Sequence, residues 1–420
     1  MAVKQKGTTK ETAIEAVEET KSIVEEQAEV EEETEIVTSD KKTKGGKNKP
    51  ARKSLLSGRI RTLEDVYIET SNIGMDMALT NGKGIPLGGF VTFWGQPGSG
   101  KTTILGDTIK RVLLKYEKLN IPCKVLYIDI EGSTNLMGSL GLQRFLDNGS
   151  LIYLHETITY NYLGDLYQGI LDGDEELKDV KLVIVDSICN VTVESKEEND
   201  IEKADYGIIA KAAKEFYRRY TPKTRGKFTS LLINQVSMNQ DAGLFGPKFK
   251  QASSEASLHY PTIIVHAQKV VGKKEDDISK LMKIKTINGE EEVQEKFIVR
   301  LTTFNEGLKL KNRFGQIPSV DILVQRGIGV VNAKVVKDLL FLHNLVTPVT
   351  KLSYAISESL PLVEHPKKNL SKTEVNTIVS NKDNLPKIVK YLKDNNLYWV
   401  KDPSTINKPQ IDADGYHVYY

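Results

Sequence analysis

Short apolar runs alternate along this chain with stretches whose apolar residues recur at helical spacing. The runs predict strands, and the residues from Leu182 to Val185 are apolar without alternation, as in a strand covered on both faces. The eight candidate strands cover residues 89–94, 124–130, 151–155, 182–186, 228–235, 262–268, 297–303 and 320–325.

Helical spacing follows several of these runs, first at residues 104–116 and later at 208–217. Strands that alternate with helices predict an α/β fold around a parallel sheet. The later strands follow one another closely, so we expect them to be antiparallel. Beyond residue 331 the pattern becomes helical, at 334–345 and 385–397, which predicts a small C-terminal domain over residues 332–420.

Residues 1–53 have a different composition. Residues 11–35 hold eleven Glu and one Lys, and residues 41–53 hold seven Lys or Arg and no acid. Such blocks bury too little apolar surface to fold alone, so we predict a disordered tail, acidic and then basic. It is either a solubilising tail or an electrostatic regulator that competes with nucleic acid for basic surface.

Composition narrows the function classes. The net charge of +2 does not indicate a nucleic-acid partner, so any such site must come from local patches. Cys123 and Cys189 lack the spacing of a zinc cluster or a disulfide scaffold and suit a reducing cytosol. Neither a membrane span nor a secretory signal is evident, so we expect a cytoplasmic protein without a membrane partner.

The strongest motif has the form GxxxxGK[ST] and lies between a predicted strand and a predicted helix. Backbone N–H groups of such a loop converge on phosphates at a helix N-terminus. Lys101 would reach the β- and γ-phosphates of ATP, and the Thr102 hydroxyl would bind Mg²⁺. The ATP-binding residues we predict are Gly95, Gln96, Pro97, Gly98, Ser99, Gly100, Lys101, Thr102 and Thr103.

Three further strands end in polar residues. Asp186 would hold Mg²⁺ through water, although a helix-capping Asp fits the same pattern. Glu131 could orient or deprotonate an attacking water, or be an ordinary turn residue. Gln235, after Asn234, could sense the γ-phosphate, or be a polar strand end.

Together these motifs resemble the RecA recombinase family over residues 71–331, with the length most like phage-encoded, UvsX-type recombinases. The resemblance rests on Ile128-Asp129-Ile130-Glu131, Asp186-Ser187 and Asn234-Gln235-Val236. It implies that Glu131 is the general base and Gln235 the γ-phosphate sensor. It also implies an oligomerisation segment at 54–84, a RecA-like P-loop core at 85–331, and helical homo-filaments. In place of an adenine-stacking Tyr this chain has Gly138, which leaves nucleotide selectivity open.

The resemblance also implies two DNA-binding loops, at about 194–206 and 237–255. Candidate DNA contacts are Tyr206, Lys211, Arg218, Phe245, Lys248 and Lys250, because lysines meet phosphates and aromatic rings stack on bases. Lys309 and Lys311 resemble the lysine pair that the family inserts into the neighbouring subunit's ATP site, and Arg313 is a rival. For the candidate DNA contacts the alternatives are an ordinary mobile surface loop and, for Lys211 and Arg218, a solvated helix face.

The predicted function is a DNA-dependent ATPase that pairs single-stranded with double-stranded DNA and exchanges strands, with ATP and Mg²⁺. A loader or a single-strand-binding protein is a candidate partner, and a phage-encoded protein would act in the host cytosol. The alternatives are a hexameric helicase of the same superfamily and a recombination mediator or signalling ATPase. The helicase would carry a larger helical N-terminal domain, and the mediator a degenerate ATP site.

Overall fold

The computed structural model describes residues 66–132, 140–194, 206–239, 248–252, 255–270, 281–286, 289–294, 296–305, 307–314, 317–366, 369–395, 397, 410–411 and 417–418. The predicted tail at 1–53 lies outside these ranges, as do Phe245 and Gly138. The described residues belong to one unit, which begins at Glu64.

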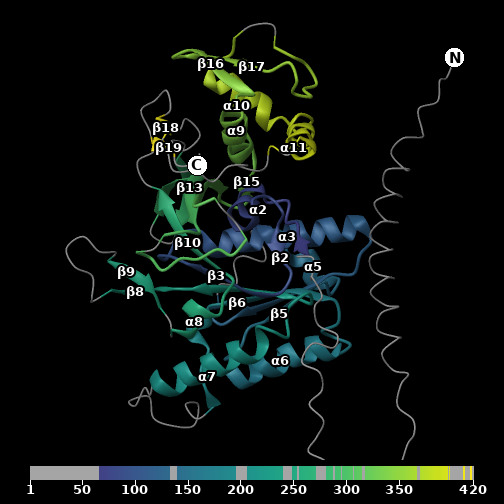
Figure 1. Cartoon of the computed structure of the whole chain (residues 1–420), viewed down its shortest axis with the longest axis vertical. Helices are drawn as coiled ribbons and strands as arrows, with labels where there is room; N and C mark the ends of the chain where they lie inside the picture. The colour runs from purple at the N-terminus through teal and green to yellow at the C-terminus, as the bar shows by residue number, and fades with distance from the viewer. Residues whose placement is uncertain are drawn as a thin grey trace, which may run out of the picture. The chain divides into compact units, whose positions relative to one another are not determined.

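A nine-stranded sheet forms the centre of this unit, in the order β15-β14-β13-β10-β3-β7-β6-β4-β5. The six strands from β10 to β5 are parallel, and β13, β14 and β15 join antiparallel at the other edge. This confirms the predicted α/β fold with a mostly parallel sheet (Figure 1). The bounds are β3 Gly89–Trp94, β4 Lys124–Asp129, β5 Leu151–Leu154, β6 Val180–Asp186, β7 Thr229–Asn234, β10 Ile263–Val270, β13 Lys296–Thr302, β14 Ser319–Gln325 and β15 Gly329–Val331.

Helices cover both faces of the parallel strands (Figure 1). On one face lie α3 (Lys101–Leu119), α2 (Ile73–Thr80) and α5 (Gln143–Asp147), and on the other α6 (Tyr160–Asp172) and α7 (Tyr206–Tyr220). Alternate strand residues face the two layers: Val91 and Phe93 belong to the α3 side, and Phe90 belongs to the α6–α7 side.

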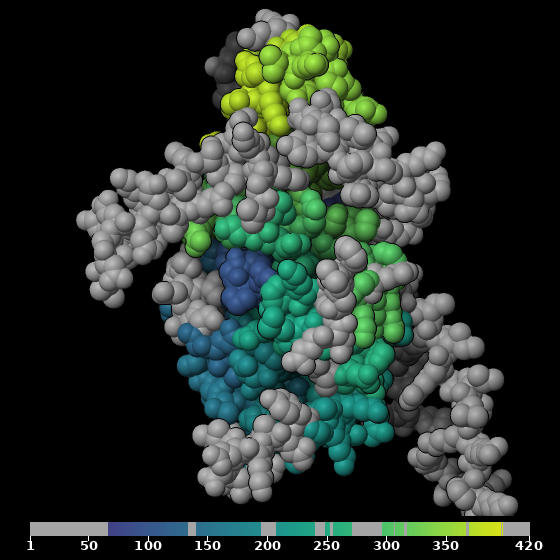
Figure 2. All heavy atoms as spheres, turned by 90° about the vertical axis from the view of Figure 1, so that its left-hand side faces the viewer, coloured from purple at the N-terminus to yellow at the C-terminus, as the bar shows by residue number. Residues whose placement is uncertain are grey.

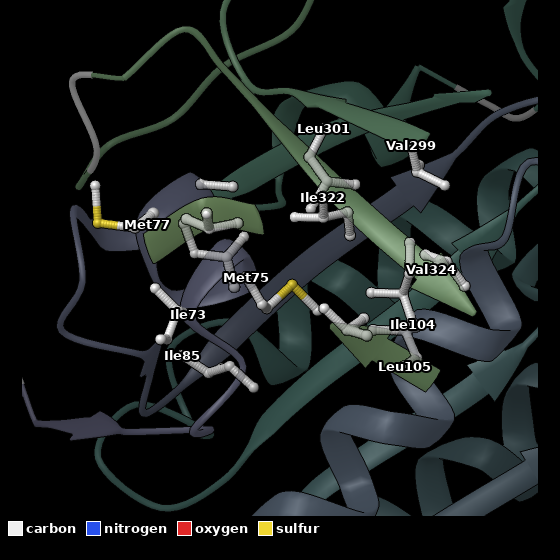
Figure 3. Close-up of a cluster of buried hydrophobic side chains, with 14 of the residues drawn as sticks. Ile73, Met75, Met77, Ile85, Ile104, Leu105, Val299, Leu301, Ile322 and Val324 are labelled. Carbon is white, nitrogen blue, oxygen red and sulfur yellow. The ribbon is translucent and has the colours of Figure 1, made fainter. Parts of the chain in front are cut away.

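The α3 side holds the largest hydrophobic cluster, part of which is drawn in Figure 3. Ile104 and Leu105 of α3 point toward Val324 of β14, and Met75 of α2 lies beside them. All four side chains are nearly inaccessible to solvent. Burying such a side chain contributes about 1.5–3 kcal/mol, so this cluster holds the helix after the phosphate-binding loop firmly on the sheet.

The eight predicted strands are all present, with ends that differ by at most two residues. The predicted helices correspond to α3, α7, α9 (Ala333–Leu342) and α11 (Leu385–Asp394). The sequence pattern did not reveal α2, α5, α6 and β15. It also missed β1 Tyr67–Ile68, β2 Ile85–Pro86, η1 Ile188–Asn190, β8 Val236–Met238, β9 Phe249–Gln251, α8 Ala256–His259, β11 Leu281–Thr286, β12 Gly289–Gln294, β16 Val346–Thr350, β17 Ser353–Ile356, α10 Lys372–Ser380, β18 Gln410–Ile411 and β19 His417–Val418.

The C-terminal elements α9, α10, α11 and the β16–β17 hairpin gather at one end of the unit (Figures 1 and 2). Their buried side chains, such as Val336, Val375 and Ile388, continue the cluster on the α3 side of the sheet. Helix α10 starts with a capping box between Ser371 and Glu374. A separate domain at 332–420 remains a prediction, as do the boundaries at 54–84 and 85–331.

Candidate nucleotide and nucleic-acid site

The phosphate-binding loop leaves the carboxyl end of β3 and enters α3 at Lys101. Gly100 caps the helix with φ 88, a left-handed conformation that favours glycine. A Cβ on Gly95 would lie 2.1 Å from the Ala267 carbonyl oxygen of β10, so this position has no space for a side chain. Gln96, Pro97 and Gly98 at the loop tip are exposed.

The Lys101 amine lies folded over this loop. It donates hydrogen bonds to the carbonyl oxygens of Gly95 at 2.7 Å and Gln96 at 3.1 Å. Burial lowers the pKa of Lys101, and the nearby carboxylates of Asp186 and Glu131 oppose that shift. The amine thus lies against the carbonyl oxygens of the loop, and its predicted contact with the β- and γ-phosphates stays a prediction.

Asp186 at the end of β6 lies beside the start of α3. Its Oδ2 accepts hydrogen bonds from the hydroxyls of Thr102 at 3.2 Å and Tyr127 at 3.0 Å. Burial raises the pKa of Asp186 to about 6, and the charge of Glu131 adds to the shift. The structure thus brings together the two residues predicted to bind Mg²⁺.

The second oxygen of this carboxyl group, Oδ1, is buried and has no hydrogen-bond partner among the residues that the structure describes. An orphaned buried carboxylate oxygen fits a water or a cation as its missing partner. Thr102 and Asp186 are therefore suited to hold Mg²⁺, directly or through water, opposite the loop that would hold the phosphates.

Glu131 follows β4 and accepts hydrogen bonds from the residues that follow β6 and β7. Its Oε1 accepts hydrogen bonds from the Gln235 amide at 2.6 Å and from the Ser187 hydroxyl at 2.6 Å. Both Glu131 and Gln235 are exposed, whereas Asn234 is buried and accepts from the Gln235 N–H. The predicted base and the predicted sensor are thus direct partners across the carboxyl ends of β4, β6 and β7.

Gln235 is also the residue that precedes the β8–β9 hairpin (Figure 1). The Ala252 N–H donates to the Gln235 carbonyl at 2.9 Å, and Ser237 pairs with Lys250. Lys248, just before β9, and Phe249 and Lys250 on β9 are all exposed. The second predicted DNA loop therefore starts as a ribbon whose base includes the predicted phosphate sensor.

The other predicted DNA contacts lie on α7. Lys211 is exposed. Arg218 is exposed too, but its guanidinium donates to Glu215 at 2.7 Å and 2.8 Å. Tyr206 is the first residue of α7, and its side chain lies outside the described residues.

Lys309 and Lys311 lie on a segment that runs beside β10. The Lys311 carbonyl accepts from the N–H of Ile264, which pairs with Thr92 of β3. Among the described residues, no hydrogen bond joins either lysine to the loop. Lys309 is exposed, and the half-buried Lys311 amine donates to the His259 carbonyl. Burial, with the charge of Arg313, lowers the pKa of Lys311 to about 8.

Several further residues of the site belong to no motif in the sequence. Tyr127 holds Asp186, Ser187 holds Glu131, and the Tyr153 hydroxyl donates to the Asp129 carboxylate at 2.7 Å. His266 lies against Trp94 with ring centroids 4.3 Å apart, and burial lowers its pKa to about 4. Alternation places Tyr127 on the same strand face as Asp129, but only the strand register brings it to Asp186.

Comparison with known proteins agrees with this geometry. Residues 80–224 match the AAA_25 family, described as "AAA domain". The curated relatives include "Protein RecA" of Sulfurovum sp. (strain NBC37-1), 26% identical over 223 residues, which are 52% of this chain and 60% of that protein. They also include "Protein RecA" of Campylobacter fetus subsp. fetus (strain 82-40), 25% identical over 226 residues, 52% and 61% of the two chains.

The central unit has the mixed α/β fold with a mostly parallel sheet that a RecA-like P-loop core has, and these similarities support a RecA-like ATPase. The chain spans about 60% of the length of the RecA proteins it matches, so the match supports the ATPase rather than their whole activity. Similarity to this core implies the use of a nucleotide and Mg²⁺, and Lys101, Thr102 and Asp186 are the candidates to bind them. Among the described helices, none combines the length and apolar character needed to cross a membrane.

Proposed function

We propose that this RecA-like ATPase is a DNA strand-exchange recombinase that forms helical filaments on single-stranded DNA. The observation that carries the proposal is the 2.6 Å hydrogen bond from Gln235 to Glu131 at the base of the β8–β9 hairpin. It connects the candidate hydrolytic residue with the candidate DNA-binding segment. The resemblance to RecA proteins adds support, and a phage-encoded, UvsX-type origin belongs to the same proposal.

The catalytic roles follow from the contacts. Bound Mg²⁺ would offset the negative charge that develops on the phosphates. Lys101 binds the phosphate oxygens, while Thr102 and Asp186 hold the cation. Glu131 accepts the proton of the attacking water, and the Ser187 hydroxyl holds the Glu131 carboxylate in place. Gln235 can donate its amide either to Glu131 or to a phosphate oxygen, so phosphate binding frees Glu131 for the water.

Coupling to DNA runs through a small apolar cluster. Trp94, Ile264 and Leu310 are buried together, with Val236 packed against them. Trp94 ends the strand before the phosphate-binding loop, Val236 begins the hairpin, and Leu310 lies between the two candidate trans lysines. A shift at one of these segments changes packing at the others, as nucleotide-dependent DNA binding requires.

Lys309 and Lys311 are proposed to act on the ATP of the adjacent protomer, because they do not contact their own loop. Single-stranded DNA would lie along Lys248 and Lys250 of the hairpin and Lys211 of α7, with Phe245 and Tyr206 against the bases. Double-stranded DNA, a loader and a single-strand-binding protein are further proposed partners, and the proposed location is the cytoplasm.

The test is ATP turnover with and without single-stranded DNA, together with oligonucleotide binding in ATP, in ADP and without nucleotide. We expect DNA to stimulate turnover and ATP to tighten binding, both lost in Lys101→Ala. Electron microscopy distinguishes filaments from the closed rings of a helicase, and a strand-exchange assay distinguishes a recombinase from a mediator. Turnover and binding that are independent of one another would contradict the proposal.

A further inference from the structure

The turn that follows β4 carries Glu131, and the edge strand β5 pairs with β4 beside it. The backbone pairing of these two strands ends at Ile128 and Leu154. One residue further on, Nδ1 of His155 lies 2.8 Å from the carbonyl oxygen of Asp129. A carbonyl oxygen can only accept, so Nδ1 carries the proton and donates it. The imidazole thus extends the junction of the two strands beyond the end of their backbone pairing.

This contact holds one peptide unit from both sides. The carbonyl of Asp129 and the N–H of Ile130 belong to the same planar group. His155 bonds the carbonyl, and the Ile130 N–H donates to the Asp186 carbonyl oxygen at 2.7 Å. The next N–H, that of Glu131 itself, donates to the same Asp186 oxygen at 3.3 Å. Because the peptide unit cannot rotate without breaking one of these bonds, the direction in which the chain enters Glu131 is fixed.

The Asp129 carboxylate fixes the other side of the turn. It belongs to a residue that is 1% exposed, and both of its oxygens are engaged. Oδ1 accepts from the Gly132 N–H at 2.8 Å, and Oδ2 accepts from the Tyr153 hydroxyl at 2.7 Å. Glu131, between Asp129 and Gly132, is exposed instead. Asp129 therefore shapes the turn, and Glu131 is the carboxylate that can meet a water.

The His155 ring also lies against the residue that follows Glu131. Gly132 has φ 73°, and a Cβ at this position would lie 3.2 Å from Cε1 of His155. The left-handed conformation favours glycine, and a side chain here would press on the ring. Tyr153 and His155 consequently contact the turn at three points, which are the Asp129 carboxylate, the Asp129 carbonyl and Gly132.

We propose that His155, supported by Tyr153, is a positioning residue for ATP hydrolysis that keeps the Glu131 carboxylate directed at the attacking water. It acts through the backbone of the turn, whereas Lys101 and Thr102 hold the nucleotide from the phosphate-binding loop. Displacing a base lowers the rate of the chemical step without removing a contact that binds the nucleotide. The inference rests on the proposed role of Glu131 as the base.

The kinetics of ATP hydrolysis by the full chain test this role. His155→Leu removes the hydrogen-bond donor, whereas His155→Asn keeps an N–H donor close to the position of Nδ1. His365→Leu, which changes an exposed histidine between β17 and α10, is the matched control. Thermal melting verifies that each variant is folded. Tyr153→Phe removes a bond to the same turn and serves as the second variant if His155→Leu does not fold.

We expect His155→Leu and Tyr153→Phe each to lower kcat about tenfold, with an unchanged KM for ATP and an unchanged Mg²⁺ requirement. His155→Asn should recover most of the lost turnover, and His365→Leu should match the wild type. In a Glu131→Gln background, followed by single-turnover assays, His155→Leu should cause no further loss, because the base that it positions is already gone.

An active wild type whose folded His155→Leu and Tyr153→Phe variants keep the full kcat would overturn the inference. So would a loss of turnover that is equally large in the Glu131→Gln background, since His155 would then act independently of Glu131. A wild type that hydrolyses no ATP would instead contradict the proposed function, and the inference with it.

Discussion

The hydrogen bond between Gln235 and Glu131 joins two side chains that are 104 positions apart in the chain. Glu131→Gln keeps the size of the side chain and an oxygen that can accept from Gln235 and Ser187, but it removes the base. We therefore expect turnover to fall about 10²–10⁴-fold, while ATP still promotes DNA binding. Turnover assays and fluorescence anisotropy check this, and a variant that also loses ATP-dependent DNA binding would show that Glu131 has a structural role.

Tyr127 is the second residue whose role depends on one contact. In Tyr127→Phe, Asp186 loses the hydroxyl that fixes its Oδ2, so we expect the Mg²⁺ concentration for half-maximal turnover to rise by roughly tenfold. Tyr153→Phe is the matched control, because that hydroxyl bonds Asp129 rather than Asp186. If both variants titrate with Mg²⁺ like the wild type, Tyr127 does not position the metal-binding carboxylate.

At the scale of elements, α2 contains a buried carboxyl group that makes stability depend on pH. Asp76 is 3% exposed, and burial raises its pKa to about 7 from 3.8, although the Thr70 hydroxyl and N–H donate to it. Between pH 4 and 7 the folded state keeps a proton that the unfolded state has lost, so the free energy of unfolding should fall as pH rises and level off above 7.

Urea unfolding at pH 5, 6, 7 and 8 measures this dependence. Asp76→Asn cannot ionise, so its stability should vary less over this range than that of the wild type, and the wild type should lose stability relative to the variant from pH 5 to pH 8. Parallel curves for the two proteins would mean that Asp76 does not titrate in this range.

The β8–β9 hairpin is the element that we expect to carry DNA affinity. Lys248→Gln combined with Lys250→Gln removes two exposed charges, so binding to single strands should weaken and the slope of log K against log salt should drop by about 1–2. Lys214→Gln, on the exposed side of α7, is a control for general loss of charge. An unchanged salt slope in the hairpin variant would place the DNA elsewhere.

At the scale of the whole molecule, an ATP site shared between protomers predicts complementation. Lys101→Ala damages the loop and leaves the lysine pair intact, whereas Lys311→Ala does the reverse. Each should be inactive alone, but an equal mixture should recover roughly a quarter of wild-type turnover if protomers alternate at random around intact interfaces. A mixture as inactive as its components would place the action of Lys311 within its own chain.

The sequence alone located eight of the nine strands of the central sheet, four of the helices and the phosphate-binding loop. Covered strands leave unbroken apolar runs, and the loop needs glycines, Lys101 and Thr102 at fixed spacing, so local residues suffice to locate them. Asp186, Glu131 and Gln235 could be suggested because each follows a strand. Their roles could not be decided there, since a polar strand end looks the same whether or not it is functional.

Only the tertiary structure decided which of these side chains meet. Strand order and register place Gln235 on Glu131 and Tyr127 on Asp186. Local patterns record the neighbours of a residue along the chain, whereas the contacts of a site depend on how distant segments are stacked, which short-range spacing does not encode.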